Sequence, residues 1–119
     1  HAMKIFNYVL SRGGRVELKP IAEVETEWKS PLKAFEETLK HERVVTSLIN
    51  ELYHLATEEK DYATQSMLKW FIDEQVEEEE NARDIIDKLK LIGDNGYGLY
   101  QFDKELAARV YTPIATTAE

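Results

Sequence analysis

Two long stretches of the chain repeat apolar residues at the three- and four-residue steps of a helix that buries one face. The first runs over residues 30–59 and the second over residues 61–91. Both apolar faces are interrupted by polar residues, Glu42 in the first stretch and Gln75 and Glu78 in the second. An unpaired buried carboxylate costs several kcal/mol. The pattern therefore indicates that the two helices share a positive partner, and a metal ion is the first candidate.

Shorter patterns surround these stretches. Residues 1–12 have helical spacing and are followed by Gly13 and Gly14, which favour a helix end. Residues 15–29 alternate without a helical period, which favours an extended connection that pairs briefly as a strand. A last short amphipathic helix is expected over residues 99–110. The chain is thus expected to be all-α.

The connections predict how these helices pack. A turn of one or two residues near Lys60 makes the two long helices antiparallel neighbours, and the extended connection lets the first helix run parallel to the second. Glu42 and Glu78 each lie eighteen residues from Lys60. At 1.5 Å per residue both are about 27 Å from the turn, so we expect them at the same height, in one site. Glu74 and Glu77 lie within one helical turn of Glu78 and extend this carboxylate group.

Composition limits the kind of partner. The 119 residues make one domain, and 15 Lys and Arg against 23 Asp and Glu give a net charge of -8. This charge argues against nucleic acid and favours cations. Without cysteine, any metal must be held by oxygen and imidazole, which suits hard or borderline ions. There is no apolar run of membrane-spanning length and no signal-peptide character at the start, so a cytoplasmic protein without a membrane segment is expected.

Three histidines and the acidic run have simpler alternatives. Glu79 and Glu80 fit an ordinary solvated helix face, and His41 and His54 lie one step off the apolar face, as surface residues do. His1, before Ala2-Met3, could be the remnant of a tag. Its helical register with the following residues favours instead a genuine position in the fold.

At this point the residues resemble a known family. The segment Trp70 to Glu79, together with Lys40-His41-Glu42, is similar to bacterial non-haem ferritin, and residues 1–16 resemble the end of that family's second helix and the turn after it. The resemblance implies a ferritin-like four-helix bundle with a long crossover and a short fifth helix. Here the first helix and most of the second have no counterpart. Residues 1–12, 30–59, 61–91 and 99–110 would be the end of the second helix, the third, the fourth and the fifth.

The resemblance also implies a function. It indicates a ferroxidase that oxidises Fe²⁺ with O₂ at a di-iron site and stores ferric mineral in a homo-oligomeric shell of twenty-four subunits. His1 would bind the first iron, and Glu42 and Glu78 the second, with Gln75 beside them. Glu74 and Glu77, sharing Glu78, would bind a third iron.

The missing positions alter this expectation. The bridging glutamate and the glutamate of the first helix have no counterpart, so we expect impaired iron binding and either further chain or a swapped second copy to complete the bundle. Two other classes remain open. One is another di-iron carboxylate enzyme, such as a rubrerythrin-like peroxidase. The other is a non-enzymatic helical module whose inward acids meet a basic partner.

Overall fold

Four helices make up the regular structure of residues 1–112, the part of the chain that the computed structural model describes. They are α1 (Ala2–Ser11), α2 (Pro31–Glu58), α3 (Tyr62–Ile92) and α4 (Gly96–Ala107). The all-α prediction is confirmed. The limits of the first three helices differ from the expected ranges by one residue at each end. None of the helices in the described range is both long and apolar enough to cross a bilayer.

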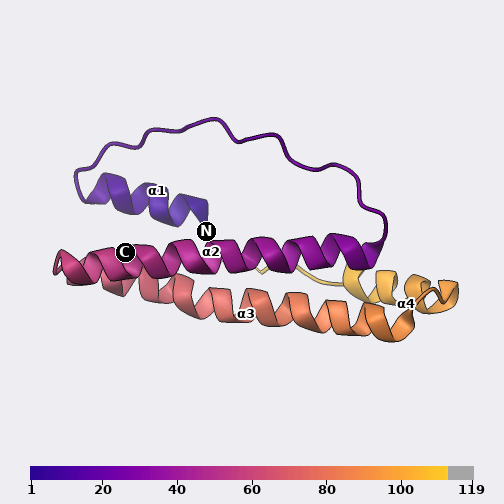
Figure 1. Cartoon of the computed structure of the whole chain (residues 1–119). Helices are drawn as coiled ribbons and strands as arrows, with labels where there is room; N and C mark the ends of the chain where they lie inside the picture. The colour runs from indigo at the N-terminus through magenta and orange to yellow at the C-terminus, as the bar shows by residue number, and fades with distance from the viewer. Residues whose placement is uncertain (113–119) are drawn as a thin grey trace.

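The long helices α2 and α3 begin at side-chain caps and are joined by a tight turn. The Ser30 hydroxyl accepts a hydrogen bond from the Lys33 amide, and a carboxylate oxygen of Asp61 accepts one from the Thr64 amide, both at 3.1 Å. Between the helices Lys60 has a φ of 55°, the left-handed conformation that commonly ends a helix. This turn reverses the chain within a few residues, so α2 and α3 lie antiparallel along their length (Figure 1).

Two apolar clusters fill the contact between α2, α3 and α4. In the first, Ile49 of α2 packs with Leu68 and Phe71 of α3. In the second, Ile85 and Leu89 of α3 pack with Phe102 of α4. Leu68 is only 1% exposed, and these are the apolar positions that the helical period marks. The polar residues that interrupt the same faces therefore lie between the two clusters.

The first helix is reached by a long extended segment. From the end of α1 the chain crosses the length of the α2–α3 pair and enters α2 at its far end, so α1 and α2 run in the same direction (Figure 1). Leu18, Ile21 and Val24 in this segment are 82%, 90% and 66% exposed. No strand forms among residues 1–112, so the expected brief strand is wrong. Alternation alone does not make a strand where no second extended segment offers its backbone.

The short last helix begins earlier than expected. The expected range was 99–110, whereas α4 spans Gly96–Ala107 because the Asn95 side chain accepts a hydrogen bond from the Gly98 amide at 2.8 Å. The glycines at this start suggest a turn in the sequence, but the cap places them in the first helical turn. Val110 consequently lies beyond the helix and is 87% exposed.

A small polar network attaches α1 to the start of α3. The Arg12 guanidinium donates to the Tyr8 hydroxyl at 3.0 Å and to Asp61 at 3.2 Å. The Tyr8 hydroxyl is 3.0 Å from that of Thr64, which donates to Asp61 at 2.6 Å. Asp61 therefore caps α3 and holds α1 at the same time.

The Asp61 link predicts a pH-dependent contribution to stability. Hydrogen bonds from the Thr64 side chain and amide, then the Arg12 charge, hold the pKa of Asp61 below its ordinary value of 3.8. Because the folded pKa is the lower one, this stabilisation is present above the unfolded value and is lost as pH falls through the folded value. We expect Asp61→Ala to lower the melting temperature at about pH 7, with the difference shrinking below pH 3.8. Thermal circular dichroism measures both, with exposed Asp103→Ala as control; equal melting temperatures at neutral pH would contradict this role.

Candidate metal centre

Three side chains from α3 and the start of α1 converge on one point. Ligand atoms of His1, Glu74 and Glu78 all lie within 4.8 Å of one another. The His1 Nε2 atom is 3.3 Å from a Glu74 carboxylate oxygen. The His1 ring also lies 5.0 Å from the Trp70 ring, between ring centroids, and the Lys4 ammonium is 4.0 Å from the Trp70 centroid. An imidazole nitrogen and two carboxylates within this distance form a candidate binding group for one cation.

This group opens onto a hollow between α1, α2 and α3. The hollow has a volume of about 460 Å³, and His1, Glu42, Gln75 and Glu78 are its polar lining. The rest of the lining is mostly apolar and includes Val45, Ile49 and Phe71. Glu42 and Glu78 thus come together across α2 and α3 at the height that the count from the turn predicts. Both carboxylates are half-buried, beside a space that can admit an ion.

Gln75 joins the two long helices beneath the carboxylates. It is 5% exposed, and its amide nitrogen donates to the Glu42 carbonyl oxygen at 3.1 Å and to a Glu42 carboxylate oxygen at 3.2 Å. A third oxygen, that of the Thr46 hydroxyl, lies 3.2 Å from the same nitrogen. The amide nitrogen of Gln75 therefore faces three oxygens of α2, and it holds the Glu42 side chain in place.

The carboxylates repel one another in the absence of a cation. Partial burial raises the pKa of Glu78 above its ordinary value of 4.5, and the charges of Glu42, Glu74 and Glu77 raise it further. Arg109 opposes these effects. A site that disfavours its own negative charge gains electrostatic stabilisation when a divalent cation enters. Oxygen and imidazole donors without thiolate suit hard or borderline divalent ions, so the residues present fit iron.

The structure separates the expected residues into groups. His1, Glu74 and Glu78 converge, and Glu42 and Gln75 line the same hollow. Glu77 is exposed and is not part of the convergent group. His41 is exposed, and His54 lies 3.5 Å from Glu58 on the surface of α2.

Sequence reasoning missed two participants. Thr46 occupies an expected apolar-face position, yet its hydroxyl is 3.2 Å from the Gln75 amide nitrogen and donates to Glu79 at 2.8 Å. Glu79 was assigned to the solvated face, but its side chain is only 19% exposed. Its spacing of four residues from both Gln75 and Arg83 was the available signal.

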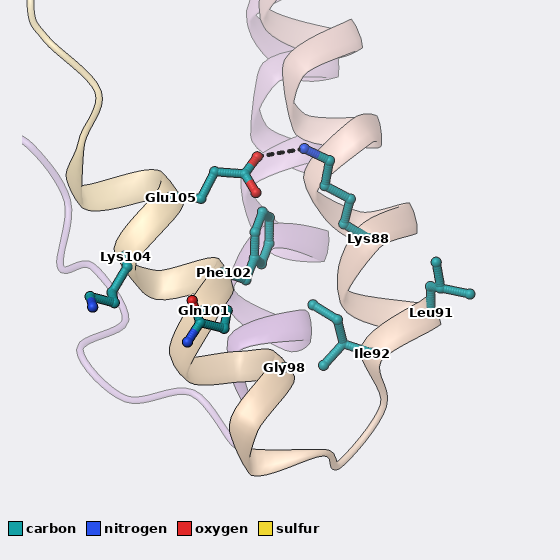
Figure 2. A pocket seen from close by; sticks show the side chains of 8 residues that line it. All are labelled: Lys88, Leu91, Ile92, Gly98, Gln101, Phe102, Lys104 and Glu105. Atoms are coloured by element: carbon teal, nitrogen blue, oxygen red, sulfur yellow. Dashed lines mark hydrogen bonds and ion pairs between the residues drawn. The ribbon is translucent and has the colours of Figure 1, made fainter.

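A larger hollow lies at the other end of the molecule. It measures about 610 Å³ and lies between the end of α3 and α4 (Figure 2). Its oppositely charged residues Lys88 and Glu105 pair with each other at 2.7 Å, and Phe102 packs below them. The hollow contains none of the convergent metal-ligand residues. Size alone does not make it the functional site.

Fold and site together define the class: an all-helical protein with carboxylate and imidazole side chains, candidate metal ligands, converging at the junction of its helices. The model of the ferritin-like domain matches residues 1–92. Bacterial non-heme ferritin of Staphylococcus haemolyticus is 46% identical over 111 residues, which is 93% of this chain and 67% of that protein. The Staphylococcus aureus protein of the same name is 40% identical over the same shares.

Solved structures agree with this assignment. The open pore ferritin of the archaeon Archaeoglobus fulgidus superposes with a TM-score of 0.91 at 51% identity, covering 92% of this chain and 68% of that one. The chain therefore belongs to the ferritin family. The resemblance to bacterial non-haem ferritin is confirmed.

The raised pKa of Glu78 predicts that the centre costs stability when no metal is bound. For an acid with a raised folded pKa, ionisation destabilises the fold, and this cost disappears below the unfolded pKa of 4.5. We expect metal-free Glu78→Gln to melt at or above the temperature of the parent at about pH 7, with no difference below pH 4.5. Thermal unfolding in the presence of a chelator tests this, with exposed Glu80→Gln as the matched control. A lower melting temperature for Glu78→Gln at neutral pH would show that the ionised carboxylate stabilises the fold instead.

Proposed function

We propose that this protein binds Fe²⁺ at the centre formed by His1, Glu74 and Glu78, with Glu42 beside it, as the first step of iron oxidation and storage. The observation that carries the proposal is the convergence of three ligand atoms within 4.8 Å in a chain of the ferritin family. In this role His1 supplies the imidazole nitrogen, and Glu78 lies between the Glu74 and Glu42 carboxylates. Gln75 positions Glu42 rather than carrying charge itself.

The proposed reaction is the oxidation of bound Fe²⁺ by O₂: two Fe²⁺ each lose one electron, and one O₂ takes up both electrons and two protons to give H₂O₂. Carboxylate ligands favour this because they stabilise Fe³⁺ more than Fe²⁺. The half-buried position leaves the site accessible to iron and O₂ through the hollow that Val45, Ile49 and Phe71 also line. The exposed carboxylate of Glu77 would be part of an additional iron site near the surface, through which iron would reach or leave Glu78. Glu74 would also contribute to this third site.

The family further supports a homo-oligomeric shell that stores the ferric product. Leu48, Leu52 and Leu55 form an apolar stripe on α2 and are 54%, 46% and 51% exposed. Such a stripe favours contact with further protein. The relatives that match this chain are named as ferritins, which supports iron storage over the peroxidase and interaction-module alternatives. A cytoplasmic location belongs to the same proposal.

A binding measurement tests the centre directly. Co²⁺ has ligand preferences close to those of Fe²⁺ and avoids oxidation during a titration. We expect Glu78→Ala to weaken Co²⁺ binding by at least roughly tenfold, the scale that even loss of an outer-shell partner reaches. Isothermal titration measures the affinity. Glu80→Ala, a change of the same charge at an exposed neighbouring position, should bind as the parent does, and equal loss in both variants would mean that only general negative charge matters.

Iron uptake in air tests storage separately from binding. A storage protein should keep adding iron to a soluble particle as Fe²⁺ is supplied, whereas a two-metal enzyme saturates at about two irons per chain. Size-exclusion chromatography with iron and protein detection measures the ratio and the particle size together. Saturation at a few irons on a small species would reject storage by this chain while leaving the binding centre intact.

A further inference from the structure

A chain of polar contacts crosses the α2–α3 interface from the candidate metal centre to the opposite side of the helix pair. It runs from the Glu42 carboxylate through Gln75 and Thr46 to Glu79. Its inner members are covered, since Gln75 is 5% exposed and Thr46 is half-buried. Its outer end, Glu79, borders a third hollow, of about 300 Å³, that Gln75 also lines. Glu79 is absent from the convergent ligand group, so its place in this series of hydrogen bonds needs another explanation.

The outer end of the chain is fixed by charge. One carboxylate oxygen of Glu79 lies 3.4 Å from the Arg83 guanidinium and 3.8 Å from that of Arg43. The other oxygen accepts the Thr46 hydroxyl at 2.8 Å. The two arginines therefore hold one oxygen of Glu79 and leave the second for Thr46. A carboxylate is a stronger acceptor than a carbonyl that is already hydrogen-bonded, so the single hydroxyl hydrogen goes to Glu79 rather than to the Glu42 carbonyl at 3.0 Å.

This choice adds a third acceptor around the Gln75 amide nitrogen and reinforces the orientation of the amide. Once its hydrogen is committed to Glu79, the Thr46 oxygen can only accept from Gln75. The Glu42 carbonyl and carboxylate oxygens around the same amide group are acceptors as well. Turning the amide by half a rotation would put its oxygen against three acceptors and leave a buried group unsatisfied. The nitrogen of Gln75 therefore faces α2.

We infer that Thr46 and Glu79 are positioning residues for the centre, acting through Gln75 on the Glu42 carboxylate. This inference rests on the proposed metal site. Glu79 accepts the hydrogen of the Thr46 hydroxyl, and the Thr46 oxygen in turn accepts a hydrogen bond from the Gln75 amide inside the α2–α3 interface. Gln75 then holds the Glu42 carboxylate toward the hollow. Neither Thr46 nor Glu79 needs to touch the metal. Outer partners of this kind orient metal ligands, and their loss commonly lowers metal affinity by roughly 10- to 100-fold.

Substitutions along the chain of contacts test the inference. Thr46→Val keeps the side-chain shape and removes the hydroxyl, and Thr46→Ser restores it. We expect Thr46→Val and Glu79→Ala each to weaken Co²⁺ binding by roughly 10- to 100-fold, and the double variant to lose little more than either alone, because both changes break one connection. Thr46→Ser should bind as the parent does. Isothermal titration measures each affinity, and far-ultraviolet circular dichroism confirms that the helices remain.

Two matched controls separate positioning from general effects. The exposed Thr38 hydroxyl donates to the Ala34 carbonyl of its own helix at 3.0 Å. Thr38→Val therefore removes a threonine hydroxyl from α2 without touching the contact between Thr46 and Glu79. Exposed Glu80→Ala removes the same charge as Glu79→Ala, one residue along α3. Both controls should bind Co²⁺ as the parent does. Parent-like affinity in Thr46→Val, or losses in the controls as large as in the test variants, would overturn the inference.

A metal-free measurement keeps the inference testable if the parent binds no Co²⁺, which would reject the proposed function. In the parent, the Gln75 side-chain amide hydrogens should exchange slowly with solvent in nuclear magnetic resonance spectra, because they are committed to Glu42 and Thr46. Faster exchange in Thr46→Val and Glu79→Ala, with parent-like exchange in Thr46→Ser, supports the chain of contacts. Unchanged exchange in Thr46→Val would overturn it without reference to any metal.

Discussion

The antiparallel packing of α2 against α3 is the constraint on which the rest of the structure depends. Because the turn at Lys60 reverses the chain within a few residues, positions equally distant from it meet across the interface. Ile49 meets Phe71, and Phe35 lies by the cluster of Ile85. The same register brings Glu42 to the level of Glu78, and Gln75, about one helical turn before Glu78, donates to the Glu42 carboxylate. Apolar clusters on both sides of this level make the register costly to change, so the polar residues are held together by a core they do not belong to.

The polar level between the clusters combines two opposite electrostatic arrangements. On the side of the hollow, Glu78 stands among the carboxylates of Glu42 and Glu74, and its pKa is raised, first by burial and then by these charges. On the other side, the negative charge of Glu79 is compensated by the positive charges of Arg43 and Arg83. Adjacent glutamates of one helix thus differ because a helix turns by about 100° per residue and directs them to different surroundings. The uncompensated side is therefore the one where a cation would be stabilised most.

The sequence was sufficient to predict a helix wherever a periodic apolar pattern was bounded by a capping residue or a helix-ending residue. The long helices, their antiparallel packing and the level of Glu42 with Glu78 followed from spacing, because helix geometry converts residue number into height. The sequence was insufficient where the structure of a segment depends on whether another segment of the chain contacts it. The exposed segment around Ile21 alternates as a strand does but meets no partner. Glu79 looked like a solvated residue because a run of glutamates does not by itself distinguish the one that contacts Thr46 of the neighbouring helix. Its four-residue spacing from Gln75 and Arg83 was the one indication.

The position of His1 depends on contacts far from the metal centre. Three side-chain links join the helices: Arg12 to Asp61, Tyr8 to Thr64 and His1 to Glu74. In this order the residue numbers fall along α1 and rise along α3, so the two helices are antiparallel. The first and last links are eleven residues apart on α1 and thirteen on α3, about 16 and 20 Å at 1.5 Å per residue. This mismatch is small enough for a histidine and a glutamate side chain to span. The network at the start of α3 therefore sets the height at which the His1 imidazole meets the carboxylates. Contacts that stabilise the C-terminal end of α1 in this way fix the position of His1 at its N-terminal end.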